Sequence, residues 1–256
     1  MRRIQTSVTG GVGTIAFDDY SSRNALSTGL VDQALSALTL MQEEGVRAIV
    51  LRSAVRGRVW SAGCDAGELP APGTDPSSHD DPVEALVRAV RRCHAPVIAM
   101  VDGAVRGGAC DLVVNCDLVI ADENATFAVV AGKLGLPYRT VDLMHFLARL
   151  PQGVVKEMFF TATPLGALRA YELGLINELM PADVLEEYVY ALAELIETRA
   201  PQTISAMKAT INELAEAVPL SPQVHECLDD RRSKVYRGPE YREGVEAFRT
   251  KRAPVF

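Results

Sequence analysis

Residues 96–121 read PVIAMVDGAVRGGACDLVVNCDLVIA, and this stretch decides the fold class. PVIAMVDG (96–103) is an apolar run that predicts a strand. Gly107 and Gly108 then open a short helix, and DLVIA (117–121) predicts the next strand. A strand, a helix and another strand in succession are typical of an α/β core.

The segments before this stretch continue the alternation. IQTSVTG and VGTIAFD flank Gly10-Gly11 and alternate polar with apolar residues, which predicts a β-hairpin. The GGVG sequence is similar to a phosphate loop, but no helix follows it, so a dinucleotide site is rejected. We further expect a helix over about 27–44, a strand buried on both faces over 48–53, a surface loop over 70–82 and a helix over about 83–93.

The carboxyl-terminal part has a different pattern. From about Pro151 onward the periodicity is helical, with VVKEMFFTA, LGALRAYELG, DVLEEYVYALAELIETRA and PQTISAMKATINELAEA as its main runs. We therefore predict an α/β core over 1–198 and a helical carboxyl-terminal region over 199–256.

Composition restricts the classes of function. The 256 residues are 48% hydrophobic and carry a net charge of −7, which argues against a nucleic-acid or anionic-membrane surface but allows a local basic pocket. The five cysteines have no CxxC or framework spacing, so we expect reduced thiols in the cytoplasm. The four histidines have no metal-ligand spacing, and no apolar run is long enough for a signal peptide or a membrane span.

Two glycine-bearing turns follow predicted strands, WSAGCDAGELP (60–70) and AVRGGACDL (104–112). Small residues there let a ligand approach the backbone closely. Two backbone N–H groups, one from each turn, would polarise a carbonyl and stabilise an enolate, and losing one such donor costs about 10²–10³ in rate. The alternative for either turn alone is tight packing of a strand against a helix.

The pairing of SAGCD with GGACD resembles the crotonase (enoyl-CoA hydratase/isomerase) superfamily. RNAL (23–26), FAVVAGKLGLP (127–137), ATPLGALRAYELGLINE (162–178) and EGVEAFRTKRAP (243–254) extend the resemblance over nearly the whole chain. It implies a spiral of ββα units, a trimerisation role for 199–256, homotrimers or dimers of trimers, and an acyl-CoA thioester substrate. It also implies an oxyanion hole formed by the backbone N–H groups of Cys64 and Gly108, with no metal and no cofactor apart from the CoA of the substrate.

The 127–140 stretch, FAVVAGKLGLPYRT, contains no Asp, Glu, His or Cys. Hydratases of the superfamily use two carboxylates; the first matches Asp111 and the second falls at or near Ala131, which disfavours hydration and isomerisation. Decarboxylation needs no base, because the carboxylate of the substrate leaves as CO₂ and an apolar pocket destabilises it beforehand. Tyr138 would orient that carboxylate or relay a proton.

GCDAGELPAPGTDPSSHDDP, LGLPY, VVKEMFFTATP and VYRGPEYREGVEAF are similar to the branch of the superfamily that decarboxylates methylmalonyl-CoA. In that branch the residue matching Tyr138 is functional. Cys64 is expected to act through its backbone and not as a nucleophile. Arg106 is expected to point away from the pocket, because an arginine on the leaving carboxylate would stabilise the ground state.

The resemblance also assigns residues to CoA binding: Ser22, Arg23, Ala25, Ala62, Asp65 and Leu69, with Phe248 and Lys251 from a neighbouring subunit. One rival is a hydratase or isomerase that uses Asp111; the other is an idle CoA-binding or RNA-binding member. A carrier-protein thioester in place of CoA, the substituent at C2, and trimer against hexamer remain open.

Overall fold

The computed structural model describes residues 3–69, 71, 81–217 and 220–256 of the chain, so most of the predicted loop over 70–82 lies outside the described residues. The strands are β1 Ile4–Thr9, β2 Val12–Phe17, β3 Ala48–Ser53, β4 Val59–Ser61, β5 Val97–Val101, β6 Ala104–Arg106, β7 Leu118–Asp122, β8 Thr126–Ala128, β9 Leu165–Gly166 and β10 Glu178–Met180. The helices of the core are η1 Tyr20–Ser22, α1 Thr28–Glu43, α2 Pro82–Arg92, α3 Gly108–Val114, α4 Ala131–Leu134, α5 Thr140–Arg149, α6 Gln152–Thr161, α7 Ala167–Glu172 and α8 Leu185–Glu197. Three more follow, α9 Pro201–Glu216, α10 Pro222–Arg237 and α11 Pro239–Arg249.

The strands form two sheets, and from β3 to β8 successive strands alternate between them. The larger has the order β1-β2-β3-β5-β7-β10, in which β1 is antiparallel to β2 and the remaining pairs are parallel. The smaller has the order β4-β6-β8-β9. Each consecutive pair, β3–β4, β5–β6 and β7–β8, gives one strand to each sheet before a helix follows. The predicted spiral of ββα units is confirmed.

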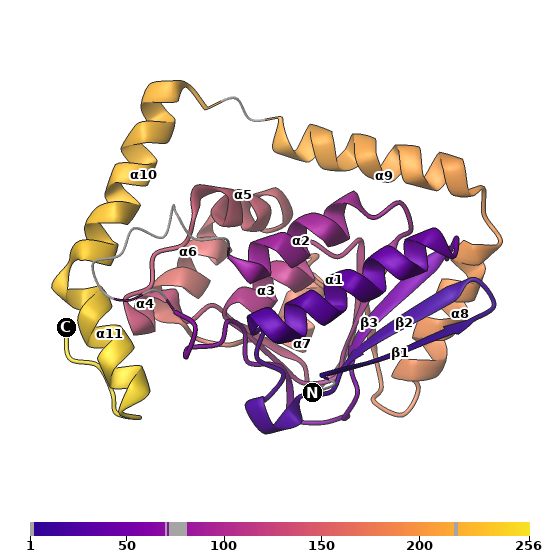
Figure 1. Ribbon diagram of the computed structural model, residues 1–256, viewed down its shortest axis with the longest axis horizontal. Helices are drawn as coiled ribbons and strands as arrows, with labels where there is room; N and C mark the ends of the chain where they lie inside the picture. Colours follow the sequence, from indigo (N-terminus) through magenta and orange to yellow (C-terminus); the bar gives the residue numbers. More distant parts are fainter. Residues whose placement is uncertain (1–2, 70, 72–80, 218–219) are drawn as a thin grey trace.

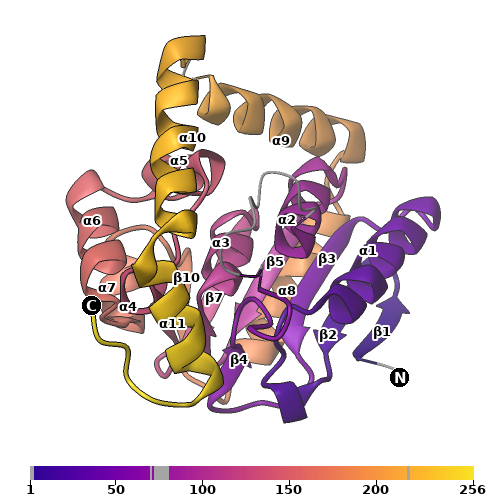
Figure 2. The ribbon, with the colours of Figure 1, turned by 60° about the vertical axis from the view of Figure 1, so that its left-hand side comes forward.

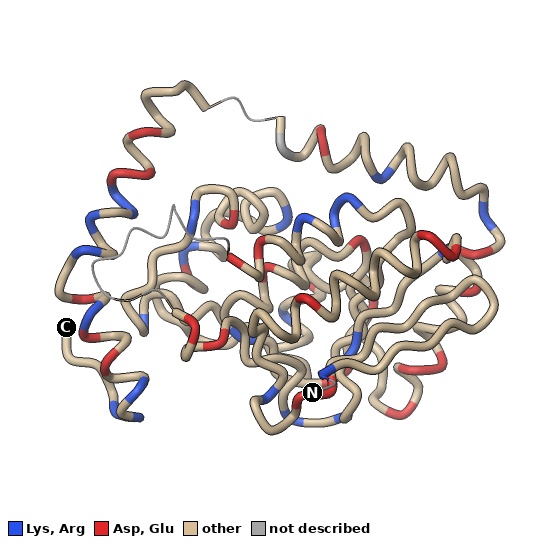
Figure 3. The backbone as a smooth tube through the Cα atoms, in the orientation of Figure 1, with Lys and Arg blue, Asp and Glu red and all other residues tan. Residues whose placement is uncertain are grey.

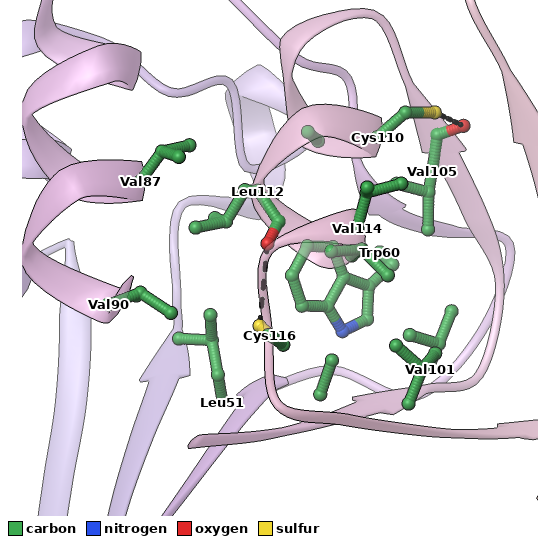
Figure 4. Packing of buried hydrophobic residues seen from close by; sticks show 14 of the residues in the cluster. Leu51, Trp60, Val87, Val90, Val101, Val105, Cys110, Leu112, Val114 and Cys116 are labelled. Atoms are coloured by element: carbon green, nitrogen blue, oxygen red, sulfur yellow. Dashed lines mark hydrogen bonds between the residues drawn. The ribbon is translucent and has the colours of Figure 1, made fainter. Parts of the chain in front are cut away.

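Buried apolar side chains hold the two sheets and the helices together. Trp60 of β4 is fully buried between the sheets and helices, donates from Nε1 to the carbonyl of Met100 at 2.8 Å, and meets Phe17 edge-on at 5.3 Å between ring centroids. Figure 4 shows Val101, Val105 and Val114 near its ring, with Leu51 and Leu112 lying between the ring and the valines of α2. Helix α8 closes the opposite face of the larger sheet, where Leu185 and Val189 are buried with strand residues.

The predicted elements are found with small shifts at their ends. The helix expected over 27–44 is α1, and the Ser27 side chain caps it by accepting from the N–H of Leu30. The uniformly helical pattern expected after Pro151 is wrong in part, because β9 and β10 interrupt it. These strands have only two and three residues, too few to produce a visible alternation, and β10 completes the larger sheet beside β7.

The carboxyl-terminal region is helical, as predicted; its boundary as a unit stays a prediction. Helix α9 lies above α2 and α5, and α10 and α11 then descend beside α4 (Figures 1 and 2). The buried ammonium group of Lys208 fastens α9 to the core by donating to the carbonyls of Val90 and Ala95 and to Oδ2 of Asp117, at 2.9, 3.1 and 2.7 Å. Basic and acidic residues are intermixed along α10 and α11 (Figure 3). In the described part of the chain, none of the helices combines the length and the apolarity that crossing a bilayer requires.

Candidate active site

The RNAL loop runs beside the SAGCD turn. The N–H of Ala62 donates to the carbonyl of Arg23 at 2.9 Å, and the N–H of Leu26 donates to the carbonyl of Gly63 at 2.8 Å. Asn24 is fully buried with φ +52°, and its Nδ2 donates to Oγ of Ser53 and to the carbonyl of Trp60, both at 3.0 Å. Asn tolerates this left-handed conformation better than most residues, so the presence of Asn at position 24 helps to fix the loop.

The SAGCD turn also meets the GGACD turn. Gly63 has φ +83°, and a Cβ at this position would lie 2.3 Å from the carbonyl oxygen of Arg106 and 3.0 Å from the nitrogen of Gly108. A Cβ on Gly108 would lie 2.7 Å from Sγ of Cys64. Glycine is therefore required for the two backbones to approach each other this closely.

Hydrogen bonding from the backbone N–H groups of Cys64 and Gly108 favours the thiolate and lowers the pKa of the Cys64 thiol, and a Cβ on Gly108 would lie 2.7 Å from its sulfur. Cys64 is exposed as a residue, although protein atoms surround its sulfur densely. Burial by the surrounding protein, reinforced by Asp81, raises the pKa of the Cys64 thiol to about 12 against the opposing effect of these hydrogen bonds. A thiol with this pKa is protonated at neutral pH and is a poor nucleophile.

Tyr138 lies in the loop between α4 and α5 and is half-buried. Its ring packs edge-on against Phe159 at 4.9 Å between centroids, and Phe159 in turn contacts Phe146 at 5.2 Å. Burial raises the pKa of the Tyr138 hydroxyl well above its usual value, and the nearby Cys64, Cys110, Asp111 and Asp142 add to the rise. The phenol is therefore neutral at neutral pH, and the structure gives it no hydrogen bond to any other described residue.

Helices α10 and α11 brace the segment that carries Tyr138. The hydroxyl of Tyr236 lies 3.4 Å from the carbonyl oxygen of Pro137, to which it donates. Gly244 of α11 packs directly on α4, because a Cβ there would lie 1.8 Å from the carbonyl oxygen of Leu134. The carboxyl-terminal helices thus help to set the position of the candidate catalytic tyrosine from within the same chain.

Asp111 lies in the first turn of α3 and is only 2% exposed. Its Oδ1 accepts from Nδ2 of Asn115 at 3.1 Å and lies 3.0 Å from Nδ1 of His145. Its Oδ2 is buried and has no hydrogen-bond partner among the described residues. His145 is itself buried, at 8% exposed, so the two side chains form an enclosed acid–base pair.

Sequence reasoning missed His145 and Asp142. Both belong to α5, directly after Tyr138, and their i, i+3 spacing places them on one side of the helix. That spacing was a visible signal, but nothing in the sequence indicated that this side faces Asp111. The 127–140 stretch itself holds no carboxylate, and α5 brings Asp142 near Asp111 from outside that stretch.

Asp142 forms an ion pair with Arg139. Its Oδ2 accepts from Nε of Arg139 at 3.0 Å and its Oδ1 accepts from Nη2 at 2.6 Å. Burial raises the pKa of Asp142, and the charge of Asp111 adds to the rise, while Arg139 opposes it. One ligand atom each from Asp111, Asp142 and His145 lies within 4.8 Å of the others. Because Arg139 occupies both oxygens of Asp142, the group is better suited to moving protons than to holding a metal ion.

The residues assigned to CoA are only partly brought together. Ser22, Arg23 and Ala25 belong to the RNAL loop, and Ala62 and Asp65 belong to the turn hydrogen-bonded to it; Leu69 lies half-buried a few residues farther along. In contrast, Phe248 and Lys251 are exposed at the end of α11, where a neighbouring subunit would be needed to use them. Contact of these eight residues with CoA stays a prediction.

Arg106 ends β6 beside Ala128 of β8, and its Nη1 is buried without a hydrogen-bond partner among the described residues. The direction expected for its side chain, away from the substrate, stays a prediction.

Comparison with known proteins agrees with this architecture. The family model for enoyl-CoA hydratase/isomerase matches residues 7–256. Methylmalonyl-CoA decarboxylase of Escherichia coli (strain K12) is 35% identical over 245 residues, which cover 96% of this chain and 94% of that protein. The mitochondrial enoyl-CoA hydratase domain-containing protein 3 of Rattus norvegicus is 29% identical over 264 residues, covering 100% of this chain and 84% of that protein.

A solved structure of methylmalonyl-CoA decarboxylase in complex with 2-nitronate-propionyl-CoA superposes on this chain with a TM-score of 0.97. The two are 34% identical, and the match covers 100% of this chain and 98% of the other. With its spiral of two sheets and the match over 7–256, this chain belongs to the enoyl-CoA hydratase/isomerase family and has the crotonase fold.

Proposed function

We propose that this protein decarboxylates methylmalonyl-CoA, or a similar malonyl-type thioester, to propionyl-CoA and CO₂. The observation that carries the proposal is the neutral, half-buried Tyr138, which feels the charge of Cys64, whose sulfur lies beside the backbone of Gly108. The similarity to methylmalonyl-CoA decarboxylase along 96% of the chain supports the same activity.

The N–H groups of Cys64 and Gly108 would bind the thioester oxygen. The Cys64 sulfur lies beside the backbone of Gly108, so the thiol side chain would turn aside when the substrate enters. As the bond between C2 and the carboxylate breaks, its electron pair moves into the thioester, and negative charge collects on the oxygen that these two donors hold. Fixed donors aimed at developing charge stabilise the transition state more than the ground state. No metal or organic cofactor is required, because the thioester itself accepts the electrons.

Tyr138 would hold the substrate carboxylate in line for this cleavage. A neutral phenol donates a single hydrogen bond, which orients a carboxylate without the strong ground-state stabilisation that a cation would give. The aromatic cluster of Tyr138, Phe159 and Phe146 solvates a carboxylate poorly, so dispersal of its charge in the transition state is favoured.

The test is turnover of methylmalonyl-CoA by the purified protein, following propionyl-CoA and CO₂, compared with the Tyr138→Phe variant. We expect the variant to lose about 10²-fold or more in kcat, on the scale of a positioned proton donor. Equal turnover by the variant would remove Tyr138 from the mechanism.

The rival activity, hydration, is favoured by one observation, the buried Asp111 held by His145. Crotonyl-CoA in the same assay decides between the two. Hydration of crotonyl-CoA without turnover of methylmalonyl-CoA would overturn the decarboxylase proposal and assign the chemistry to Asp111.

We also propose a cytoplasmic homotrimer or dimer of trimers. The cysteines support the location because the described ones are all free. The apolar residues exposed on α9 support the assembly.

A further inference from the structure

A cavity separate from the RNAL and SAGCD loops reaches Asp111 from another side. It has a volume of about 450 Å³ and lies between α2, α5 and α9. Its inner lining includes the buried Asp111, Asp142 and His145, and its outer lining includes the exposed Arg92, His94 and Glu213. The cavity therefore runs from the surface to the acid–base pair, and it is polar and large enough to hold several water molecules.

Two of the cations along this cavity are already paired. Arg139 binds Asp142 and Glu84, and Lys208 donates to Asp117 and to two carbonyls. An anionic ligand at Arg139 or Lys208 would have to displace these partners. Water is the occupant that the lining suits, because carboxylate, imidazole and amide groups all exchange hydrogen bonds with it.

Decarboxylation requires a proton, and this cavity is suited to supply it. Loss of CO₂ leaves an enolate, and its carbon must gain one proton to give the saturated thioester. The aromatic surroundings of Tyr138 are poorly suited to supply bulk water. Asp111 acts electrostatically on Tyr138, and its buried Oδ2 has no hydrogen-bond partner among the described residues, so this oxygen is available for the proton transfer.

We propose that Asp111 protonates the enolate carbon and that His145 reloads Asp111 with protons from the water-filled cavity beneath α9. This rests on the enolate chemistry of the proposed function, and not on the methyl substituent of the substrate. Oδ2 of Asp111 gives its hydrogen to carbon as the C–H bond forms. Nδ1 of His145 then returns a proton to Oδ1, while Nε2 takes one from cavity water.

A half-turn of the carboxyl group brings the hydrogen back to Oδ2, and exchange of the ring protons of His145 with cavity water restores its Nδ1–H form. One solvent proton is consumed for each CO₂ released, so the cycle balances. The cavity lining includes Asp111 and His145 but not Tyr138, so the acid regains its proton without admitting water to the aromatic pocket. His145 acts here only through Asp111 and is a positioning and relay residue.

The test uses two substitutions of His145 with different consequences. In His145→Asn, the amide keeps a donor near the position of Nδ1 but does not transfer a proton; His145→Ala removes both functions. His94→Asn is the matched control, because His94 lines the same cavity but is exposed and lies outside the pair. Thermal unfolding of each variant verifies that it folds.

Two readouts separate this inference from the assignment of the substrate. The first is kcat and KM with methylmalonyl-CoA; the second is exchange of the α-hydrogen of propionyl-CoA in D₂O, followed by mass spectrometry. We expect both His145 variants to lose about 10²-fold in kcat and in exchange, with KM unchanged, while His94→Asn matches the wild type.

Wild-type exchange and turnover in His145→Asn, with loss only in His145→Ala, would reduce His145 to a hydrogen-bond donor and overturn the relay. Unchanged activity in both variants would overturn it as well. If the wild type does not decarboxylate methylmalonyl-CoA, exchange that is lost in both His145 variants still supports the relay, although the substrate is then wrong. Absence of exchange in the wild-type protein overturns the relay whether or not CO₂ is released.

Discussion

At the residue scale, Asp102 is the clearest test of how burial affects stability. It follows β5 and is 4% exposed, and burial raises the pKa of its carboxyl to about 6, with the charge of Asp122 adding and Arg52 and Arg56 opposing. The folded protein thus holds this proton at pH values where the unfolded chain, with a pKa near 3.8, has lost it. Stability therefore decreases as pH rises from about 4 to 6.

Asp102→Asn removes this dependence. We expect the variant to gain about 3 kcal/mol in the free energy of unfolding at pH 7, since the pKa rises from 3.8 to about 6 and one pKa unit corresponds to about 1.4 kcal/mol. At pH 3.5 the Asp102 carboxyl is largely protonated in both the folded and the unfolded chain, so the gain in stability should vanish. Urea unfolding at the two pH values measures this. Destabilisation at pH 7 would mean that the ion pair with Arg56, at 3.8 Å, outweighs the cost of burying the charge.

Residues also differ in how much the sequence reveals about them. The glycines of SAGCD and GGACD were recognisable because their requirement is local: close backbone approach excludes any side chain at Gly63. The pair of Asp111 and His145 was not, because the two lie 34 positions apart, with β7, β8 and α4 between their helices. Each looks like an ordinary helical residue until packing of α3 against α5 brings the two together.

At the element scale, the contact of α11 with α4 decides how firmly the Tyr138 loop is held. Gly244→Ala would place a methyl group 1.8 Å from the carbonyl oxygen of Leu134, so α11 must move. We expect a loss of about 1–3 kcal/mol in stability, with reduced kcat, as for other overpacked sites. Gly153→Ala is the control, because a Cβ there meets nothing within 4 Å. Unfolding and turnover measurements on both variants give the comparison, and an unaffected Gly244→Ala would show that the loop does not depend on α11.

The length of a helix or strand also decides whether its sequence pattern can be recognised. Long periodic helices such as α1, and apolar strands such as β3, were predicted to within a few residues, because many positions carry the signal. The three-residue strands of the smaller sheet carry almost none. Their existence follows from pairing between distant segments, and the resemblance to a known family, not periodicity, is what predicted the spiral.

At the scale of the whole molecule, α9 leaves an apolar stripe in solvent. Met207, Ile211 and Leu214 are 54, 63 and 71% exposed and follow a helical spacing on one side. A continuous apolar face of this kind is typical of a surface that another protein covers, and here we expect a second and third copy of the chain. Ile211→Glu should weaken assembly, because it places a charge in the middle of the stripe. Gln202→Glu, on the same helix but outside the stripe, is the control for added charge.

Native mass spectrometry over a range of concentrations measures the outcome. The wild type and Gln202→Glu should give about three or six times the 27.7 kDa of one chain, while Ile211→Glu shifts toward the single chain on dilution. If Phe248 and Lys251 serve the CoA of a neighbouring subunit, the dissociated variant should also show a higher KM with little change in kcat, because the proposed oxyanion donors and Tyr138 come from one chain. Dissociation with an unchanged KM would contradict a binding site shared between subunits, and an undisturbed trimer would show that the stripe on α9 is not the interface.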